Sequence, residues 1–156
     1  MATPSRSLVE KDSMLRLLIR GYESLIVAYS GGVDSTFLAS VAYEVLGARS
    51  LAVTSRSPSV APEELAAAVE LAAARGWRHM VVDTDEMSDP RYVVNDGRRC
   101  FFCKTELYSH LDRVAVAEGI TKVANGANMD DLGDYRPGME AALNFEVVSP
   151  LVEAGL

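Results

Sequence analysis

One stretch of sequence, residues 24–36, constrains the fold of this chain more than any other. It runs Ser-Leu-Ile-Val-Ala-Tyr-Ser-Gly-Gly-Val-Asp-Ser-Thr. An apolar run, two glycines and then hydroxyl-bearing residues are typical of a buried parallel strand, a tight turn and the start of a helix. The N–H groups in the first turn of such a helix are free to bind an anion. The stretch therefore predicts a phosphate-binding turn at the end of a buried strand.

The residue types in this turn suit a phosphate. Gly31 and Gly32 can both adopt positive φ and let a phosphate approach the backbone. The hydroxyls of Ser30, Ser35 and Thr36 are expected to donate hydrogen bonds to it. Two commoner phosphate loops are excluded, because neither the lysine of GxxxxGK[ST] nor a GxGxxG triplet is present here. A plain strand-to-helix turn is the structural alternative.

Composition and charge limit the class of protein. The chain has 156 residues, 49% of them hydrophobic, which is enough for one globular domain with its own core. It has no apolar run long enough for a membrane span and no signal-peptide core, so we expect a cytoplasmic protein without membrane partners. The net charge of -7 disfavours bulk nucleic acid as a partner. ATP can still bind where a helix end and Mg²⁺ neutralise its phosphates.

Strand-like and helix-like segments alternate along the chain. Strands are expected directly before the glycines and at residues 50–54, 79–83, 122–125 and 146–149. Helices are expected within residues 1–23, over residues 34–46, and from Pro62, Cys100 and Pro137 onward. This alternation predicts an α/β fold: a Rossmann-like, doubly wound, five-stranded parallel sheet with helices on both faces. Ligands of such sheets bind at the carboxyl ends of the strands.

A second group of polar residues follows the expected fourth strand. The segment Asn-Gly-Ala-Asn-Met-Asp-Asp, residues 125–131, would lie beside the glycine turn across the switch point of the sheet. Gly126 would let an adenine ring lie close to the backbone. Asp130 and Asp131 are placed to hold Mg²⁺, because hard cations take carboxylate oxygens and keep several waters. Solvated capping of an acidic turn is the alternative.

The two cysteines of the chain, Cys100 and Cys103, have CxxC spacing. On a helix they face the same way, and such pairs bind soft metals or exchange disulfides. Two ligands do not close a zinc or iron–sulfur site, so a further ligand would come from a partner or from sequence after Leu156. A thioredoxin-like redox pair and two partly buried small residues are the alternatives.

These motifs together resemble a known family. SGGVDS looks like the PP-loop, SGGxDS, of the ATP pyrophosphatases, in which the loop holds the pyrophosphate end of ATP and the enzyme adenylates an acceptor. NGANMDD is similar to the GxNxDD stretch of PP-loop enzymes that thiolate RNA. The segments AYSGGVDST, RRCFFCKTELYSHL, NGANMDDLGDYRPG and VVSPLVEAGL resemble the N-terminal half of the ATP-dependent sacrificial sulfur transferases of the LarE type.

The resemblance implies a reaction and a domain plan. Members of that family adenylate a carboxylate of a pyridinium nucleotide, release pyrophosphate and replace AMP with sulfur, which yields the nickel-pincer nucleotide cofactor. In one branch a protein cysteine gives up its sulfur. In the other, three cysteines hold a [4Fe-4S] cluster, and Cys100 and Cys103 match two of them. Residues 1–23 would form an N-terminal helix and residues 24–156 a PP-loop domain, truncated before a C-terminal sulfur-transfer region.

The resemblance also assigns roles to single residues. The residues expected to bind ATP are Ala28, Ser30, Gly31, Gly32, Asp34, Ser35, Thr36, Thr54 and Gly126. Asp131 would hold Mg²⁺, and Asp130 is the weaker candidate. Asp34, Lys104 and Arg136 are the candidate catalytic residues. Asp34 would fix the loop and cap the helix, while the two cations would stabilise developing negative charge or be ordinary surface residues.

Other functions fit parts of the sequence. An ammonia-using synthetase, similar to the NAD and GMP synthetases, would share the adenylation step, although the CxxC pair argues against it. An RNA-thiolating enzyme would share the cysteine chemistry, but the acidic balance disfavours it. A non-catalytic ATP- or AMP-binding module is the alternative from another class. The expected partner is a small-molecule nucleotide carboxylate, and a homo-oligomer is compatible with the sequence.

Overall fold

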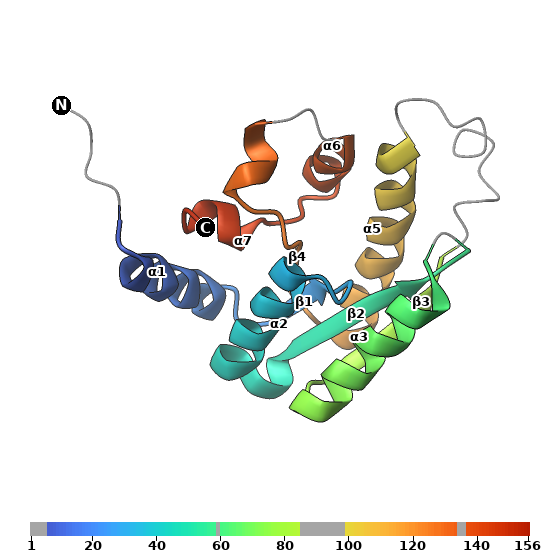
Figure 1. Ribbon diagram of the computed structural model, residues 1–156, viewed down its shortest axis with the longest axis horizontal. Coiled ribbons are helices and arrows are strands. Elements are labelled where there is room, and N and C mark those ends of the chain that lie inside the picture. Colours follow the sequence, from blue (N-terminus) through green and yellow to red (C-terminus); the bar gives the residue numbers. More distant parts are fainter. Residues whose placement is uncertain (1–5, 59, 85–98, 134–136) are drawn as a thin grey trace.

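The computed structural model describes residues 6–58, 60–84, 99–133 and 137–156 (Figure 1). Four strands form one sheet in the order β3-β2-β1-β4. They are β1 (Leu25–Ala28), β2 (Ser50–Arg56), β3 (His79–Asp83) and β4 (Lys122–Ala124). Every neighbouring pair is parallel. The carboxyl ends of the strands therefore meet at one edge of the sheet.

Helices connect the strands and cover the sheet. The helices are α1 (Leu8–Gly21), α2 (Val33–Leu46), α3 (Pro62–Arg75), α5 (Arg99–Glu118), α6 (Pro137–Asn144) and α7 (Pro150–Glu153), with 3-10 turns η1 (Gly47–Arg49) and η3 (Met129–Gly133). Pro62 occupies the first turn of α3, where a missing N–H costs nothing. Gly47 and Gly76 follow α2 and α3 with φ of 58° and 70°. These signals explain why the predicted start of α3 and the predicted end of α2 are confirmed.

The sheet carries a hydrophobic cluster on each face. Ile26 of β1 packs with residues of α5 and α6, whereas Leu25 and Val27 pack with residues of α1, α2 and α3. Neighbouring residues of a strand point to opposite faces, so an all-apolar strand is buried on both sides. Figure 1 shows the resulting layers, with the sheet between the two groups of helices. The predicted doubly wound α/β arrangement is confirmed.

The described sheet has four strands and not the five that the sequence predicted. Residues 146–149 contribute a single parallel bridge, between Ala124 and Val148. Glu146 adopts a left-handed φ of 55°, and Pro150 already begins α7. Only the few residues between Glu146 and Pro150 can be extended. This segment is too short to form a regular strand paired with β4.

α1 begins with a reciprocal cap. Ser7 Oγ accepts from the Glu10 N–H at 3.2 Å, and the Glu10 carboxylate accepts from the Ser7 N–H at 3.0 Å. Leu15 and Ile19 bury the inner face of the helix in the cluster shared with α2. Among the described helices, none is both long and apolar enough to cross a bilayer.

Candidate functional site

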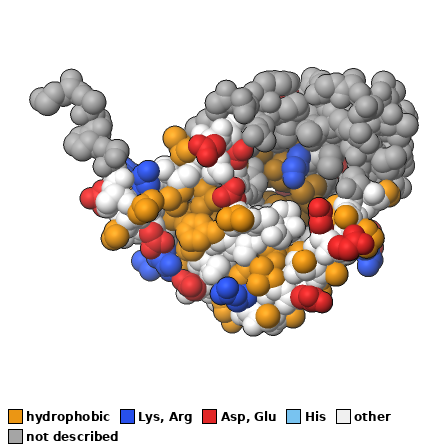
Figure 2. Space-filling view, in the orientation of Figure 1, with side chains coloured by type: hydrophobic (Ala, Val, Ile, Leu, Met, Phe, Trp, Pro, Cys, Tyr) orange, Lys and Arg blue, Asp and Glu red, His pale blue; other side chains and the backbone are white. Residues whose placement is uncertain are grey.

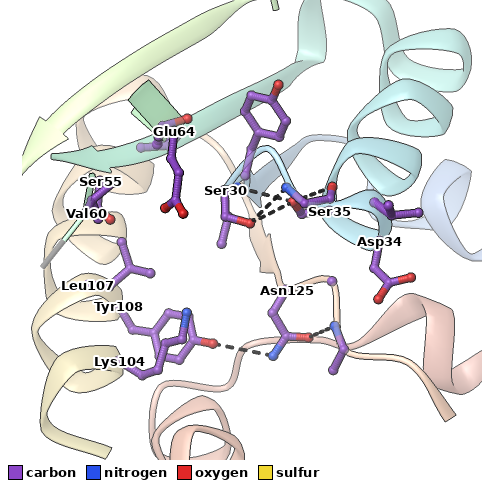
Figure 3. Close-up of a pocket in the computed structure, with 18 of the residues that line it drawn as sticks. Ser30, Asp34, Ser35, Ser55, Val60, Glu64, Lys104, Leu107, Tyr108 and Asn125 are labelled. Atoms are coloured by element: carbon purple, nitrogen blue, oxygen red, sulfur yellow. Dashed lines mark hydrogen bonds between the residues drawn. The ribbon is translucent and has the colours of Figure 1, made fainter. Parts of the chain in front are cut away.

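A cavity of about 480 Å³ lies at the carboxyl ends of the strands, between α2, α3 and α5 (Figure 3). Most of the predicted site residues line it. Those residues are Ala28, Ser30, Gly32, Asp34, Ser35, Thr54, Lys104, Gly126 and Asp131. The sequence thus predicted where the cavity lies, because parallel strands bring these distant segments to one edge.

The turn between β1 and α2 is shaped by its first glycine. Gly31 has a φ of 88°, and a Cβ there would stand 3.2 Å from the Cβ of Ala68 on α3. Gly32 has a φ of -68° and is the N-cap of α2, where no side chain caps the helix. The prediction of positive φ is confirmed for Gly31 and wrong for Gly32, because an N-cap residue takes extended backbone. The uncapped helix start leaves N–H groups for an anion.

Two serines brace the turn. The Ser30 N–H donates to Ser35 Oγ at 3.1 Å, the two hydroxyl oxygens lie 3.2 Å apart, and the Gly32 N–H donates to Ser30 Oγ at 3.3 Å. Figure 3 shows this group at the upper rim of the cavity. Ser35 is buried whereas Ser30 is exposed. Ser30 is therefore the hydroxyl better placed for a ligand, and Ser35 holds the turn in shape.

Gly126 lies where the loop after β4 meets the start of α2. A Cβ on Gly126 would stand 2.9 Å from the backbone nitrogen of Ser35 and 3.0 Å from its Cα. Real Cβ atoms do not approach backbone so closely, so only glycine fits. The contact with α2 is a structural reason for glycine at this position, and Gly126 also lines the cavity, so the predicted approach of an adenine stays a prediction. The glycine therefore joins the two halves of the site.

The acidic loop after β4 is tied to the start of α2 by one asparagine. Asn128 Nδ2 donates to Asp34 Oδ2 at 2.8 Å, across 94 positions of sequence. The Asn128 N–H donates to Asp131 Oδ2 at 2.8 Å, and Asn128 Oδ1 accepts from the Asp131 N–H at 3.2 Å. Asp130 is exposed and is not among the residues that line the cavity. Asp34 and Asp131 are thus the two aspartates that share this corner.

The walls of the cavity come from α3 and α5. Glu64 of α3 points into the cavity from one side, and Lys104 and Tyr108 of α5 lie on the other (Figure 3). Asn125 at the end of β4 forms part of the floor. Its Nδ2 donates to the Tyr108 hydroxyl at 3.4 Å, and its Oδ1 accepts from the Ser149 hydroxyl at 2.9 Å. Charged groups of both signs therefore face a cavity whose floor is hydrogen-bonded in place.

Thr54 of β2 lines the cavity and is hydrogen-bonded to His79 of the neighbouring strand β3. Its hydroxyl lies 2.8 Å from His79 Nε2 on β3, and Thr54 is 3% exposed. Burial lowers the pKa of His79 below its ordinary value. Burial also raises the pKa of Tyr29, whose ring packs edge-on against His79. Both rings are therefore held neutral beside the cavity.

Some predicted site residues fall elsewhere. Gly31 and Thr36 line a separate hollow on the other side of the turn, beside α3. Cys100 and Cys103 lie in the first turns of α5, but their side chains are outside the described part of the chain. Arg136 also lies outside the described residues. Within the described residues, no group of three or more His, Cys, Asp or Glu could hold a metal ion.

Comparisons with known proteins find relatives that match nearly the whole of this chain. The chain is 32% identical over 149 residues to a pyridinium-3,5-bisthiocarboxylic acid mononucleotide synthase of Lactiplantibacillus plantarum, covering 95% of this chain and 54% of the synthase. This likeness agrees with the resemblance of the chain to the PP-loop ATP pyrophosphatases. It is also 47% identical over 146 residues to an uncharacterized protein of Synechocystis, covering 94% of this chain and 54% of the relative. The chain thus spans about half the length of these relatives.

Solved structures share this fold at low sequence identity. The NH3-dependent NAD synthetase of Campylobacter jejuni matches with a TM-score of 0.65 and 15% identity, over 81% of this chain and 59% of that one. NMN synthetase of Francisella tularensis matches with a TM-score of 0.63 and 15% identity, over 92% and 73%. No protein-family profile matches the chain. The solved structures establish the fold and nothing finer.

The geometry adds four residues to the site that had no role assigned from the sequence, although two of them, Asn125 and Asn128, lie in the segment expected beside the glycine turn. Glu64, Tyr108, Asn125 and Asn128 all line the cavity or bond to residues that do. A signal existed for Asn128, because Asn and Asp three residues apart are a reciprocal capping pattern. For Glu64 and Tyr108 the sequence held no signal, since their positions depend on how α3 and α5 approach the PP-loop.

Proposed function

We propose that this PP-loop chain is part of an enzyme that transfers AMP from ATP to a carboxylate of a small nucleotide and releases pyrophosphate. Sulfur would then replace AMP, in the synthesis of a nickel-pincer nucleotide cofactor. The observation that carries the proposal is the uncapped start of α2 at residues 30–36, which opens on a cavity beside Asp131 and Lys104. The likeness to the pyridinium mononucleotide synthase supports the choice of acceptor.

The proposed roles follow the geometry. Gly31 and the first residues of α2 would hold the β and γ phosphates with their N–H groups, and Ser30 with its hydroxyl, beside the positive end of α2. The N–H groups of Ser30 and Gly32 already donate to serine hydroxyls and brace the turn. Thr36 faces the other hollow, so its predicted hydrogen bond to phosphate stays a prediction. Thr54 would contact the nucleoside from β2. An oxygen of the acceptor carboxylate would attack the α phosphorus, and the bond to the β-phosphate oxygen would break, so that pyrophosphate leaves with the electron pair.

The acidic corner fits a magnesium ion. Asp34 and Asp131 offer two carboxylates, and Mg²⁺ is held by one or two carboxylates together with substrate phosphates and waters. Bound there, Mg²⁺ would supply charge neutralisation for the departing pyrophosphate. Lys104 would add a donor from the opposite wall. Asp130 is exposed and outside the cavity lining, so we propose Asp131 as the acid of this pair.

An iron–sulfur cluster is not part of the proposed mechanism. Cys100 and Cys103 would supply two thiolates from the start of α5, one fewer than the cluster branch uses. We therefore derive no step through a cluster. The division into an N-terminal helix, residues 1–23, and a PP-loop domain that continues into a sulfur-transfer region remains a proposal.

The reaction can be tested directly. The protein is incubated with α-labelled ATP, Mg²⁺ and a pyridinium nucleotide carboxylate, and AMP and pyrophosphate are quantified. We expect equimolar AMP and pyrophosphate, strongly reduced in Asp131→Asn and unchanged in Asp112→Asn, whose carboxylate is exposed on α5. ADP and phosphate, or tight ATP binding without any product, would contradict adenylation. An amide product formed with added ammonia would point to the synthetase alternative.

A further inference from the structure

Asn128 uses all of its polar groups on two aspartates from distant parts of the chain. Its backbone N–H and its Oδ1 bond Asp131, and its Nδ2 bonds Asp34, with each donor–acceptor distance between 2.8 and 3.2 Å. Asn128 is half-buried, whereas Asp34 is exposed at the rim of the cavity. Asn128 thus bonds both carboxylates of the acidic corner, that of Asp34 through its side-chain amide and that of Asp131 through its backbone N–H.

Local turn chemistry explains only part of this arrangement. The two bonds to Asp131 form a reciprocal cap at the start of η3, and many residues could supply such a cap. The bond to Asp34 does nothing for η3, because Asp34 lies on α2. A side chain that caps η3 and also reaches α2 needs an acceptor and a donor on one planar group. Asparagine is the smallest residue that has both.

Charge explains why a neutral donor suits this position. Two carboxylates brought to one corner repel each other, and a hydrogen-bond donor between them offsets that repulsion. A lysine or arginine would do so as well, but it would cancel the negative charge that attracts a cation. Asn128 orients the Asp34 carboxylate with its side-chain amide and the Asp131 carboxylate with its backbone N–H, and both carboxylates keep their charge.

We propose that Asn128 is a positioning residue that holds Asp34 and Asp131 in register as one divalent-cation site beside the PP-loop. This inference rests on the proposed function, because it concerns the cation that accompanies ATP. Asn128 acts through the two carboxylates, and the cation contacts them. Residues that orient metal ligands typically change metal affinity about 10- to 100-fold when they are lost.

The test measures cation binding and not turnover. Binding of Mn²⁺ is followed by electron paramagnetic resonance in the presence of α,β-methylene-ATP, which cannot be cleaved between its α and β phosphates. Asn128→Ser keeps a hydroxyl that can cap η3, but it is too short to reach Asp34. We expect about 10-fold weaker Mn²⁺ binding or more for Asn128→Ser, with a urea midpoint close to that of the unchanged protein. Asn144→Ala, which alters an exposed asparagine at the end of α6, is the control and should bind Mn²⁺ normally.

A double-mutant cycle separates positioning from a general loss of structure. If Asn128 acts through Asp34, then Asn128→Ser should weaken Mn²⁺ binding no further in an Asp34→Ala background. Independent, multiplying effects would overturn the inference, as would normal Mn²⁺ affinity in Asn128→Ser. If the unchanged protein binds the ATP analogue but no Mn²⁺, the cation site is wrong while nucleotide binding stands. If it binds neither, the proposed function fails too.

Discussion

Gly126 is the residue at which the two halves of the site touch. A methyl group there would collide with the backbone of Ser35, at 2.9 and 3.0 Å, and backbone cannot move aside as a flexible side chain can. We expect Gly126→Ala to lower the free energy of unfolding by about 1–3 kcal/mol, the usual cost of overpacking. Urea denaturation measures this. Gly21→Ala is the matched control, because nothing lies within 4 Å of a Cβ at Gly21. Equal stability of Gly126→Ala and the unchanged protein would refute the close contact.

His79 gives the protein a specific dependence on pH. Burial lowers its pKa in the folded state below the ordinary value of 6.5, which it keeps when unfolded. Between these two values the unfolded chain binds a proton that the folded chain does not. Stability therefore falls as the pH drops through this window and is fully present above pH 6.5.

His79→Gln isolates this effect from the carboxylates that titrate lower. The glutamine amide can still bond the Thr54 hydroxyl, and neighbouring Tyr29 stays neutral throughout because its pKa is raised. We expect the melting temperature of the unchanged protein to fall more steeply between pH 7 and pH 5 than that of His79→Gln. If the melting temperatures of the two proteins change equally with pH across this range, the prediction that folding lowers the pKa of His79 is wrong.

At the scale of elements, α5 places one cation opposite the PP-loop. Lys104 lies on the wall of the cavity facing the start of α2, and its position suits charge that develops on the departing phosphates. Removal of one such donor typically costs about 100-fold in turnover. We therefore expect Lys104→Met to lower kcat by roughly that factor, with a much smaller change in KM for ATP.

Lys122→Met is the control for Lys104. Lys122 is exposed at the start of β4, at the opposite end of the strand from the cavity. Steady-state measurement of pyrophosphate release distinguishes the two variants. A raised KM with normal kcat in Lys104→Met would mean that the lysine binds ATP equally in the ground state and the transition state.

Elements with local signals were predictable from the sequence, and contacts between elements were not. Apolar β1, the helix start at the PP-loop and the first turn of α3 at Pro62 each have their cause within a few residues. The fifth strand failed because the left-handed backbone of Glu146 leaves no mark in an apolar pattern. The contact of Gly126 with Ser35 was not predicted, because Ser35 is 91 positions away along the chain. The Asn128 bond to Asp34 was missed for the same reason.

At the scale of the whole molecule, apolar surface gathers over two helices. Figure 2 shows hydrophobic side chains over α1 and α2, with acidic and basic groups scattered around them. Leu8, Val9 and Leu17 of α1 and Val33 and Phe37 of α2 are all at least 42% exposed. Exposed apolar patches often mark interaction sites. A homo-oligomer therefore stays a prediction, which sedimentation of the purified protein would test.

The two hydrophobic clusters share the central strand β1, and this should make them unfold together. Leu25 and Val27 belong to one cluster and Ile26 to the other. Unfolding of either cluster therefore removes packing that holds β1, and with it packing of the other cluster. Leu38 lies in the first cluster and Leu111 in the second, both fully buried. We expect each leucine-to-alanine change to cost about 2–5 kcal/mol of unfolding free energy.

Trp77, the single tryptophan, packs against the first cluster and reports on that face alone. Urea unfolding followed by tryptophan fluorescence and by far-UV circular dichroism should give coincident transitions in the unchanged protein. Leu111→Ala should then shift the fluorescence midpoint as much as Leu38→Ala does, although Leu111 lies on the opposite face of the sheet. If Leu111→Ala leaves the Trp77 transition in place and shifts only the circular dichroism, the two faces unfold independently and β1 does not couple them.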